Sequence, residues 1–184
     1  MPGGPTAGHR RVRALPCPFV PFPLIRPALG WVVVLDVVAW ALLSSVVGYV
    51  GHRLPARLLL RDRGPLRLTA AEGRGTPWRQ LGIRRWKDLL PEAGALFPGG
   101  VSKRALGGHD DEALHRMTRE TRRAEIVHWA LLVAWPPFLL WNPPWLAAAM
   151  AVYAVAANLP CLAAQRWNRV RLLRVLERRA ARLR

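Results

Sequence analysis

The chain has 184 residues, a length typical of one domain, and it combines two properties that soluble domains rarely share. Hydrophobic residues make up 52% of it, while 28 Lys and Arg against 11 Asp and Glu give a formal net charge of +17. A nucleic-acid-binding protein would explain the charge but not the long apolar runs, so we expect no nucleic-acid partner. A membrane protein explains both, because apolar runs enter lipid and arginines stay at the anionic leaflet.

Residues 1–28 contain a group of arginines followed by an apolar stretch that five prolines interrupt. Such a start resembles a signal peptide, but the prolines favour an irregular proline-rich tail instead. Residues 31–50 follow as an apolar run with one charge, Asp36. At about 1.5 Å per residue this run reaches the thickness of the hydrocarbon layer, roughly 30 Å. It is the predicted first membrane span and opens the main domain, residues 29–175.

Residues 52–125 are the predicted cytoplasmic segment and carry sixteen Lys and Arg residues. Stretches rich in Gly and Pro within it predict loops. Residues 78–90 mix Leu and Trp with cations and predict a short interfacial helix. Asp110 or Asp111 is expected to cap a long helix that continues into the next apolar segment.

Two more apolar segments, residues 126–141 and 145–164, flank an Asn-Pro-Pro turn and predict a helical hairpin that supplies the second and third spans. A Pro-Pro pair inside the first arm is expected to kink it. The last segment, residues 166–184, repeats apolar residues every three or four positions among arginines. This pattern predicts a basic amphipathic helix on the anionic leaflet. An RNA-binding arm has the same pattern, but the preceding spans favour the membrane.

The sequence therefore predicts an all-α integral membrane protein with about three transmembrane spans plus interfacial amphipathic helices. The positive-inside rule places the basic middle segment and the C-terminus in the cytoplasm of a multi-pass protein of the bacterial cell membrane. Three spans would put the N-terminal arginines outside, so the N-terminal orientation stays open, as does the oligomeric state. Two distant cysteines without any metal-ligand spacing indicate no metal site.

A helix through residues 111–135 would place Glu125 and His128 on its apolar face, three residues apart, where the chain enters lipid. Ionisable groups at that depth are costly unless partnered, which makes them candidates for function. Glu125 could orient the imidazole while the other ring nitrogen of His128 takes a proton from an alcohol. A structural hydrogen bond to a neighbouring helix would explain the pair equally well.

Polar groups within and beside the spans are the remaining candidates. Asp36 and Asn158 either hydrogen-bond between helices or line a polar cavity together with His128. Cations and amides near the inner membrane edge could bind an anionic acyl thioester or headgroup phosphates. The predicted substrate-binding residues are Arg122, Arg123, Lys103, Asn158, Gln165, Arg166 and Asn168.

The order of these segments resembles a known family. The resemblance is carried by residues 81–91 (LGIRRWKDLLP), 102–104 (SKR), 120–129 (ETRRAEIVHW), 158–161 (NLPC) and 165–169 (QRWNR). These blocks resemble the glycosyl-4,4'-diaponeurosporenoate acyltransferase family of small bacterial membrane proteins, over roughly residues 31–175. The blocks R-W-K-D-x-L-P and T-R-R-A-E-x-x-H-W are quite specific when they occur together, and each alone would be weak. Its first named members esterify a glucose hydroxyl of a glycosylated C30 carotenoid acid with a fatty acyl chain.

The resemblance implies O-acyl transfer at the cytoplasmic leaflet, in glycolipid or carotenoid biosynthesis, onto a hydroxyl of a lipid-linked acceptor. Acyl-CoA or another acyl thioester would be the donor, and no cofactor is expected. His128, supported by Glu125, would act as the base. Arg122, Arg123 and Lys103 would hold the donor's phosphates, and Asn158, Gln165 or Asn168 would stabilise the oxyanion. The alternative is a non-catalytic membrane scaffold or subunit with a lipid-binding basic surface. Acceptor and acyl chain stay open.

Overall fold

The computed structural model describes residues 23–90 and 110–184, so the expectations for most of the N-terminal tail, for the loop before Asp110 and for Lys103 lie outside the described residues. All regular structure in the described part is helical, which confirms the all-α class. The long helices are α1 (Leu29–His52), α4 (Asp111–Leu132) and α5 (Pro144–Arg182). The short ones are η1 (Ala56–Leu59), η2 (Gly64–Leu66), α2 (Ala70–Arg74), α3 (Thr76–Gln80), η3 (Ile83–Arg85), η4 (Lys87–Leu89) and η6 (Pro136–Leu140).

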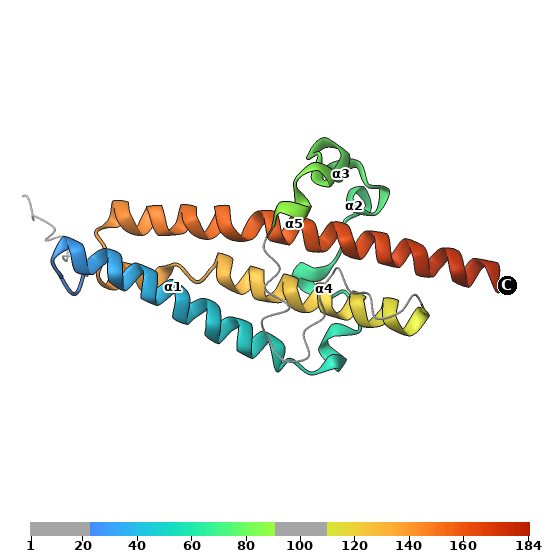
Figure 1. Ribbon diagram of the computed structural model, residues 1–184, viewed down its shortest axis with the longest axis horizontal. Helices are drawn as coiled ribbons and strands as arrows, with labels where there is room; N and C mark the ends of the chain where they lie inside the picture. The colour runs from blue at the N-terminus through green and yellow to red at the C-terminus, as the bar shows by residue number, and fades with distance from the viewer. Residues whose placement is uncertain (1–22, 91–109) are drawn as a thin grey trace, which may run out of the picture.

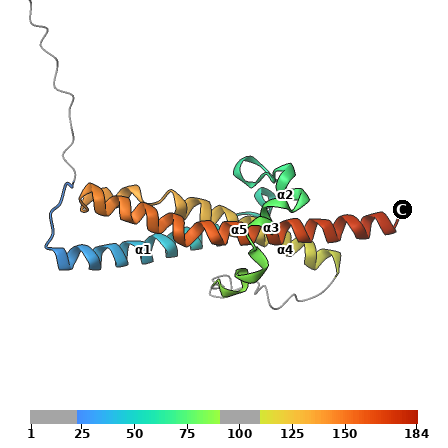
Figure 2. The ribbon, with the colours of Figure 1, turned by 90° about the horizontal axis from the view of Figure 1, so that it is seen from above.

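The three long helices lie along the long axis of the molecule (Figure 1). α4 packs mainly on α5, in the opposite direction, and α1 packs on α4. α1 and the first half of α5 fill one end, which we call the apolar half. The first half of α4 and the last half of α5 fill the other end, which we call the basic half. The short helices α2 to η4 lie against α5 near its middle (Figures 1 and 2).

α1 is apolar over most of its length, yet Val32, Asp36 and Gly51 are its only buried residues. Large side chains point outward from it, such as Trp31 and Val37, which are 66% and 65% exposed. Soluble proteins seldom expose apolar surface on this scale, whereas a helix in lipid does so along its whole length. Within the described chain, α1 and α5 are the two helices long and apolar enough to cross a membrane by length and composition.

The expected span at residues 126–141 is not a single helix. α4 ends at Leu132, and the chain continues through a turn into η6. The two prolines that open η6 lack N–H groups, so α-helical hydrogen bonding cannot continue through them. Aromatic packing holds this segment instead, because the buried ring of Phe138 lies 4.8 Å from that of Trp40 and 5.3 Å from that of Trp141.

The last two expected helices, residues 145–164 and 166–184, are one helix of 39 residues. Pro160 lies inside this helix without ending it. Trp167 and Val170, beyond the apolar stretch, are buried. The basic end therefore continues along the axis of α5, which corrects the expectation of a separate helix, while its place on a leaflet stays a prediction.

Residues 70–89, from α2 to η4, form what we call the collar. Its Trp78 and Ile83 are buried against Trp167 of α5. Gly82 has φ 55°, a left-handed conformation that favours glycine, and it separates α3 from η3. The interfacial helix expected over residues 78–90 is therefore three short pieces.

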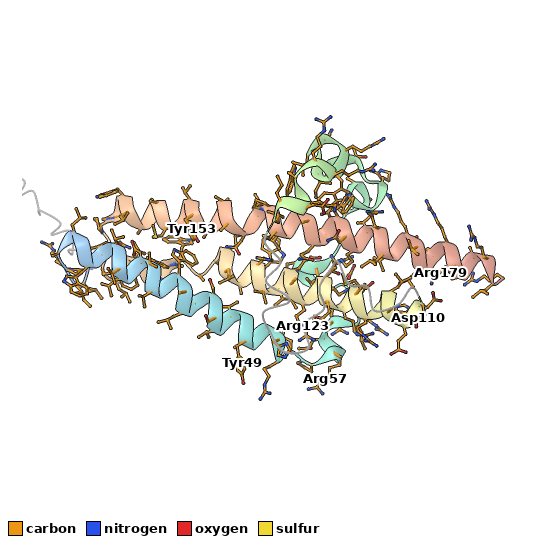
Figure 3. All side chains as sticks on the ribbon, viewed as in Figure 1. Tyr49, Arg57, Asp110, Arg123, Tyr153 and Arg179 are labelled. Atoms are coloured by element: carbon orange, nitrogen blue, oxygen red, sulfur yellow. The ribbon has the colours of Figure 1, made fainter. Side chains whose placement is uncertain are left out.

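The N-terminus of α4 is capped as the sequence predicts. The Asp110 carboxylate accepts the Ala113 N–H at 2.7 Å. Beside it, Arg179 of α5 donates to Asp111 at 2.8 Å, which links α5 to the start of α4 in the basic half (Figure 3). Tyr153, also labelled in Figure 3, lies in the apolar half, where its ring is 5.2 Å from that of Trp40.

Candidate functional site

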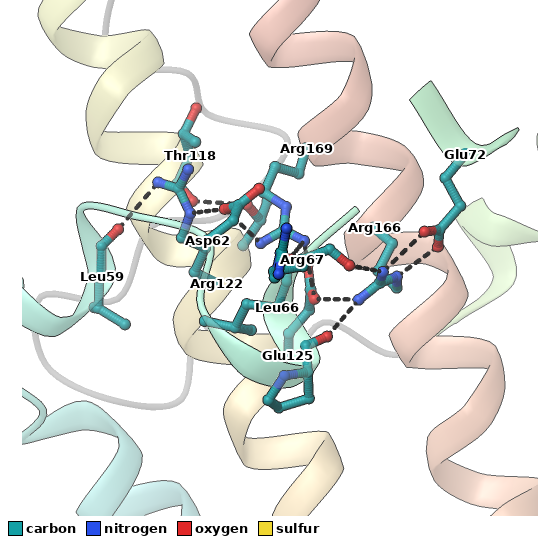
Figure 4. A network of polar contacts seen from close by, with 12 residues as sticks. Leu59, Asp62, Leu66, Arg67, Glu72, Thr118, Arg122, Glu125, Arg166 and Arg169 are labelled. Carbon is teal, nitrogen blue, oxygen red and sulfur yellow. Dashed lines mark hydrogen bonds and ion pairs between the residues drawn. The ribbon is translucent and has the colours of Figure 1, made fainter. Parts of the chain in front are cut away.

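Six charged side chains meet in the middle of the molecule, where α4 and α5 face each other (Figure 4). They are Asp62, Glu72, Arg122, Glu125, Arg166 and Arg169, and we call them the central network. Glu125 and Arg169 are completely buried. Three acids and three arginines balance one another, and this pairing is what makes buried charge tolerable.

Glu125 lies on α4 between two guanidinium groups of α5. Its Oε2 accepts from Arg166 Nη1 at 3.2 Å and from Arg169 Nη2 at 3.2 Å. Burial raises the pKa of Glu125 from its ordinary 4.5 to about 7, although both arginines oppose that rise. The carboxyl therefore titrates near neutrality. The hydrogen bonds described for Glu125 go to these two arginines, and the expected Glu125–His128 pair stays a prediction.

Arg166, predicted to bind substrate, is held inside the fold. Its Nε and Nη2 donate to the two carboxylate oxygens of Glu72 at 2.6 and 2.9 Å. Two backbone carbonyls, those of Pro65 and Arg67, accept from it at 2.8 and 2.7 Å. Burial alone would raise the pKa of Glu72, but hydrogen bonds from Arg166 and Thr69 lower it to about 2. This ion pair fastens the collar to α5.

The side chains of Arg122 and Arg123 also have partners within the protein. Arg122 is buried, and it donates to Asp62 at 2.6 Å and to the Leu59 carbonyl at 3.0 Å. Arg123 donates to backbone carbonyls where α1 ends, including that of Gly51 at 3.0 Å. Both guanidinium groups are thus already engaged within the protein, and their binding of a donor stays a prediction.

His128 is half-buried near the end of α4, and its Nδ1 lies 3.0 Å from Asn158 Oδ1. Asn158 Nδ2 donates to the Ala154 carbonyl at 2.9 Å, so the amide oxygen is the atom that faces the ring. An oxygen only accepts, and Nδ1 must therefore carry the proton of the neutral imidazole. Nε2 is then the basic nitrogen. Asn158 is thus a described hydrogen-bond partner of the imidazole.

Asp36 lies in a different part of the fold. It accepts from Trp141 Nε1 at 2.8 Å and from Asn142 Nδ2 at 2.7 Å, at the tip that joins η6 to α5. Asn158 lies fourteen residues into α5, about 20 Å along the helix from that tip. Asn158 thus bonds between two helices, while Asp36 joins α1 to the turn between η6 and α5 and does not share a site with His128.

The two remaining amide candidates lie further along α5. Gln165 is buried and Asn168 is half-buried. At 1.5 Å per residue they are about 10 and 15 Å along the axis from Asn158. The structure therefore does not bring them together with the imidazole. No three His, Cys, Asp or Glu side chains within residues 23–90 and 110–184 are grouped to hold a metal.

Asp62, Glu72 and Arg169 were not predicted as members of a site. The sequence around Glu72 does contain a recognisable pattern, because Thr69-Ala-Ala-Glu72 has the spacing of a capping box. Both hydrogen bonds of that capping box are present in the structure. That box fixes the carboxylate that Arg166 then uses. Asp62 and Arg169 carried no such local signal.

Comparison with known proteins agrees with the sequence blocks. The family model described as glycosyl-4,4'-diaponeurosporenoate acyltransferase matches residues 65–178, which include the His128–Asn158 pair and all of the central network except Asp62. A protein of that name from Staphylococcus haemolyticus is 31% identical over 134 residues, covering 72% of this chain and 78% of the relative. Proteins of the same name from Staphylococcus aureus strains bovine RF122 / ET3-1 and USA300 are both 28% identical over 149 residues, covering 78% of this chain and 88% of each relative. No solved structure matches the chain. The chain therefore belongs to the glycosyl-4,4'-diaponeurosporenoate acyltransferase family and is an acyltransferase of groups other than aminoacyl groups.

Proposed function

We propose that the protein is a membrane O-acyltransferase that esterifies a sugar hydroxyl of a glycosylated carotenoid acid, or of a related lipid-linked acceptor, with a fatty acyl chain. The donor is an acyl thioester such as acyl-CoA. The names of the relatives support the acceptor class. The observation that carries the mechanism is the hydrogen bond between His128 Nδ1 and Asn158 Oδ1, which makes Nε2 the basic nitrogen.

In the proposed reaction the hydroxyl oxygen attacks the thioester carbonyl carbon while His128 Nε2 accepts the hydroxyl proton. The tetrahedral intermediate collapses, the carbon–sulfur bond breaks, and the imidazolium returns the proton to the departing thiolate. The imidazole of His128 is therefore neutral again at the end of the reaction. A well-placed base of this kind contributes about 10²–10⁴ in rate. Asn158 positions the ring, and Glu125 acts at a distance, by fixing α4 against α5.

The proposed setting is the bacterial cell membrane, with α1 and the first half of α5 spanning it and η6 completing a third crossing. The exposed apolar surface of α1 supports this arrangement, as does the bond from Asp36 to Asn142, which makes α1 part of the fold. The positive-inside rule then puts the basic half in the cytoplasm. His128 lies one turn of α4 beyond the central network, on the side of the apolar half. An acceptor whose hydrocarbon chain lies in lipid would place its sugar at the depth of His128.

The test is acyl transfer from a labelled acyl-CoA to a glycosylated carotenoid acid by the purified protein. We expect His128→Ala to lower kcat by about 100-fold or more. His115→Ala is the matched control, since His115 is an exposed histidine of the same helix. A folded His128→Ala protein with the parental rate would remove the proposed base.

The orienting role of Asn158 has its own readout. Asn158→Leu removes the acceptor for the Nδ1 proton and should lower kcat with little change in KM. Asn158→Asp retains an oxygen at that position and should restore most of the rate. Equal losses in both variants would mean that Asn158 serves packing alone. A parent protein that forms no ester with any thioester tested would favour the scaffold alternative.

A further inference from the structure

A pocket of about 670 Å³ lies between the collar and the face of α5 that points away from α4. Its lining is dominated by cations, and no described acidic residue belongs to it. The arginines that line it are Arg74, Arg79, Arg84, Arg85, Arg171 and Arg174. Trp78 and Trp167 contribute aromatic walls. None of the six residues of the central network belongs to this lining.

The charge of this pocket is not balanced by the described part of the protein. None of its six arginines forms an ion pair with a described acid, in contrast to the arginines of the central network. The two acids of the collar are already engaged, Glu72 by Arg166 and Asp88 by Lys87. Gathering like charges around one hollow costs free energy, and a bound anion would recover it.

The geometry of the pocket is set by contacts that hold individual cations in place. Arg171 lies over the Trp167 ring at 4.7 Å, and Lys87 lies over the same ring at 5.2 Å. Arg174 Nη2 donates to the Gly73 carbonyl at 2.5 Å. Gly75, with φ 85°, lets the chain pass close to Arg174, because a Cβ there would lie 3.2 Å from its guanidinium. These arginines are positioned before any ligand arrives.

We propose that this pocket binds the phosphate groups of a small anionic ligand. Guanidinium groups match phosphate oxygens in charge and in planar geometry, and several of them here converge on one space. Two sources of phosphate fit, the nucleotide portion of a coenzyme A donor and the headgroup of an anionic phospholipid. Trp167 lies three residues, about 5 Å, beyond the apolar stretch of α5, so the pocket begins at the depth of the headgroups. The donor source rests on the proposed acyl transfer, while phosphate binding itself does not.

The test compares two double charge reversals in the full-length protein in nonionic detergent. Arg79→Glu with Arg84→Glu alters the pocket. Arg57→Glu with Arg63→Glu is the control, because these arginines are also exposed and lie outside the pocket lining, and the change in net charge is the same. Isothermal titration at fixed ionic strength measures binding of coenzyme A in one arm and of short-chain phosphatidylglycerol in the other.

We expect the pocket variant to bind at least one probe about tenfold or more weakly, while the control binds it as the parent does. A loss confined to coenzyme A identifies the donor, a loss confined to phosphatidylglycerol identifies the headgroup, and a loss of both identifies phosphate as the shared element. The proposal is overturned if the parent binds neither probe, or if the control loses as much affinity as the pocket variant. Should the reversal prevent folding, seen by circular dichroism, the Arg79→Gln and Arg84→Gln pair repeats the comparison. Binding is measured without acyl transfer, so a negative result here does not decide whether His128 is the base.

Discussion

Replacing Glu125 by Gln tests whether the buried carboxyl holds a proton near neutral pH. Gln keeps the shape of the side chain and removes its titration. In the parent, burial raises the pKa of Glu125 from 4.5 to about 7. Between these values the folded protein binds a proton that the unfolded chain has released. The free energy of unfolding of the parent should therefore fall as pH rises through this range.

The size of the effect follows from the pKa difference. The step from 4.5 to about 7 corresponds to about 3–4 kcal/mol, at about 1.4 kcal/mol for each pH unit. Most of this change falls between pH 5 and pH 8. Glu72 adds little there, because its pKa of about 2 keeps it ionised in the folded protein throughout. The two proteins have the same histidines, so the contribution of these residues to the pH dependence cancels in the comparison. The stability of the parent relative to Glu125→Gln should thus decrease by about 2 to 3 kcal/mol from pH 5 to pH 8.

The assay is urea unfolding of both purified proteins in nonionic detergent, followed by tryptophan fluorescence at pH 5, 6, 7 and 8. Each pair of curves gives one difference in free energy of unfolding. A difference that stays constant with pH would refute the reasoning, as would one that grows in favour of the parent. Either result would mean that the two arginines outweigh burial and keep the carboxyl ionised.

Two further substitutions, measured by the same unfolding assay, probe buried contacts. Arg169→Met removes a fully buried guanidinium and leaves Glu125 with Arg166 as its remaining described ion-pair partner, so at pH 8, where the carboxyl is ionised, we expect a loss of about 3–5 kcal/mol. Arg171→Met, on the exposed side of α5, should cost less than about 1 kcal/mol, and equal losses would contradict this account. Gly51→Ala would overlap the Cγ2 methyl of Val127 where α1 meets α4, at a cost of about 1–3 kcal/mol. Gly30→Ala, with nothing within 4 Å, is its control, and a comparable loss there would exclude the overlap as the cause.

Local signals accounted for the parts of the fold that were predicted. An apolar run of membrane-spanning length marked α1, and a carboxylate at the right position marked the start of α4, where Asp110 caps the helix. Helical periodicity also placed Glu125 on a buried face of α4, and it is completely buried. Each of these features depends on residues within a few turns of one another.

Long-range partners could not be predicted from such signals. Glu125 meets Arg166 and Arg169, which are 41 and 44 residues away. From the sequence, Arg166 was predicted to bind substrate and Arg169 to lie on a basic amphipathic surface, because the rotation of α5 about its axis is set only when it packs on α4. Asn158 was predicted to bond between helices or to line a cavity with His128, but its direct bond to the imidazole depends on the register between the two helices.

The end of α1 shows how the order of synthesis bears on assembly. The carbonyl of Gly51 accepts a hydrogen bond from the guanidinium of Arg123, which lies 72 residues later in the chain. The last turn of a helix leaves its carbonyls without partners inside the helix. Until the ribosome has delivered α4, the end of the nascent first helix has only water and local backbone donors such as the Leu54 N–H, which lies 3.2 Å from the Gly51 carbonyl. The position of this end against the rest of the fold is therefore fixed only after α4 has been made and the Arg123 side chain has bound.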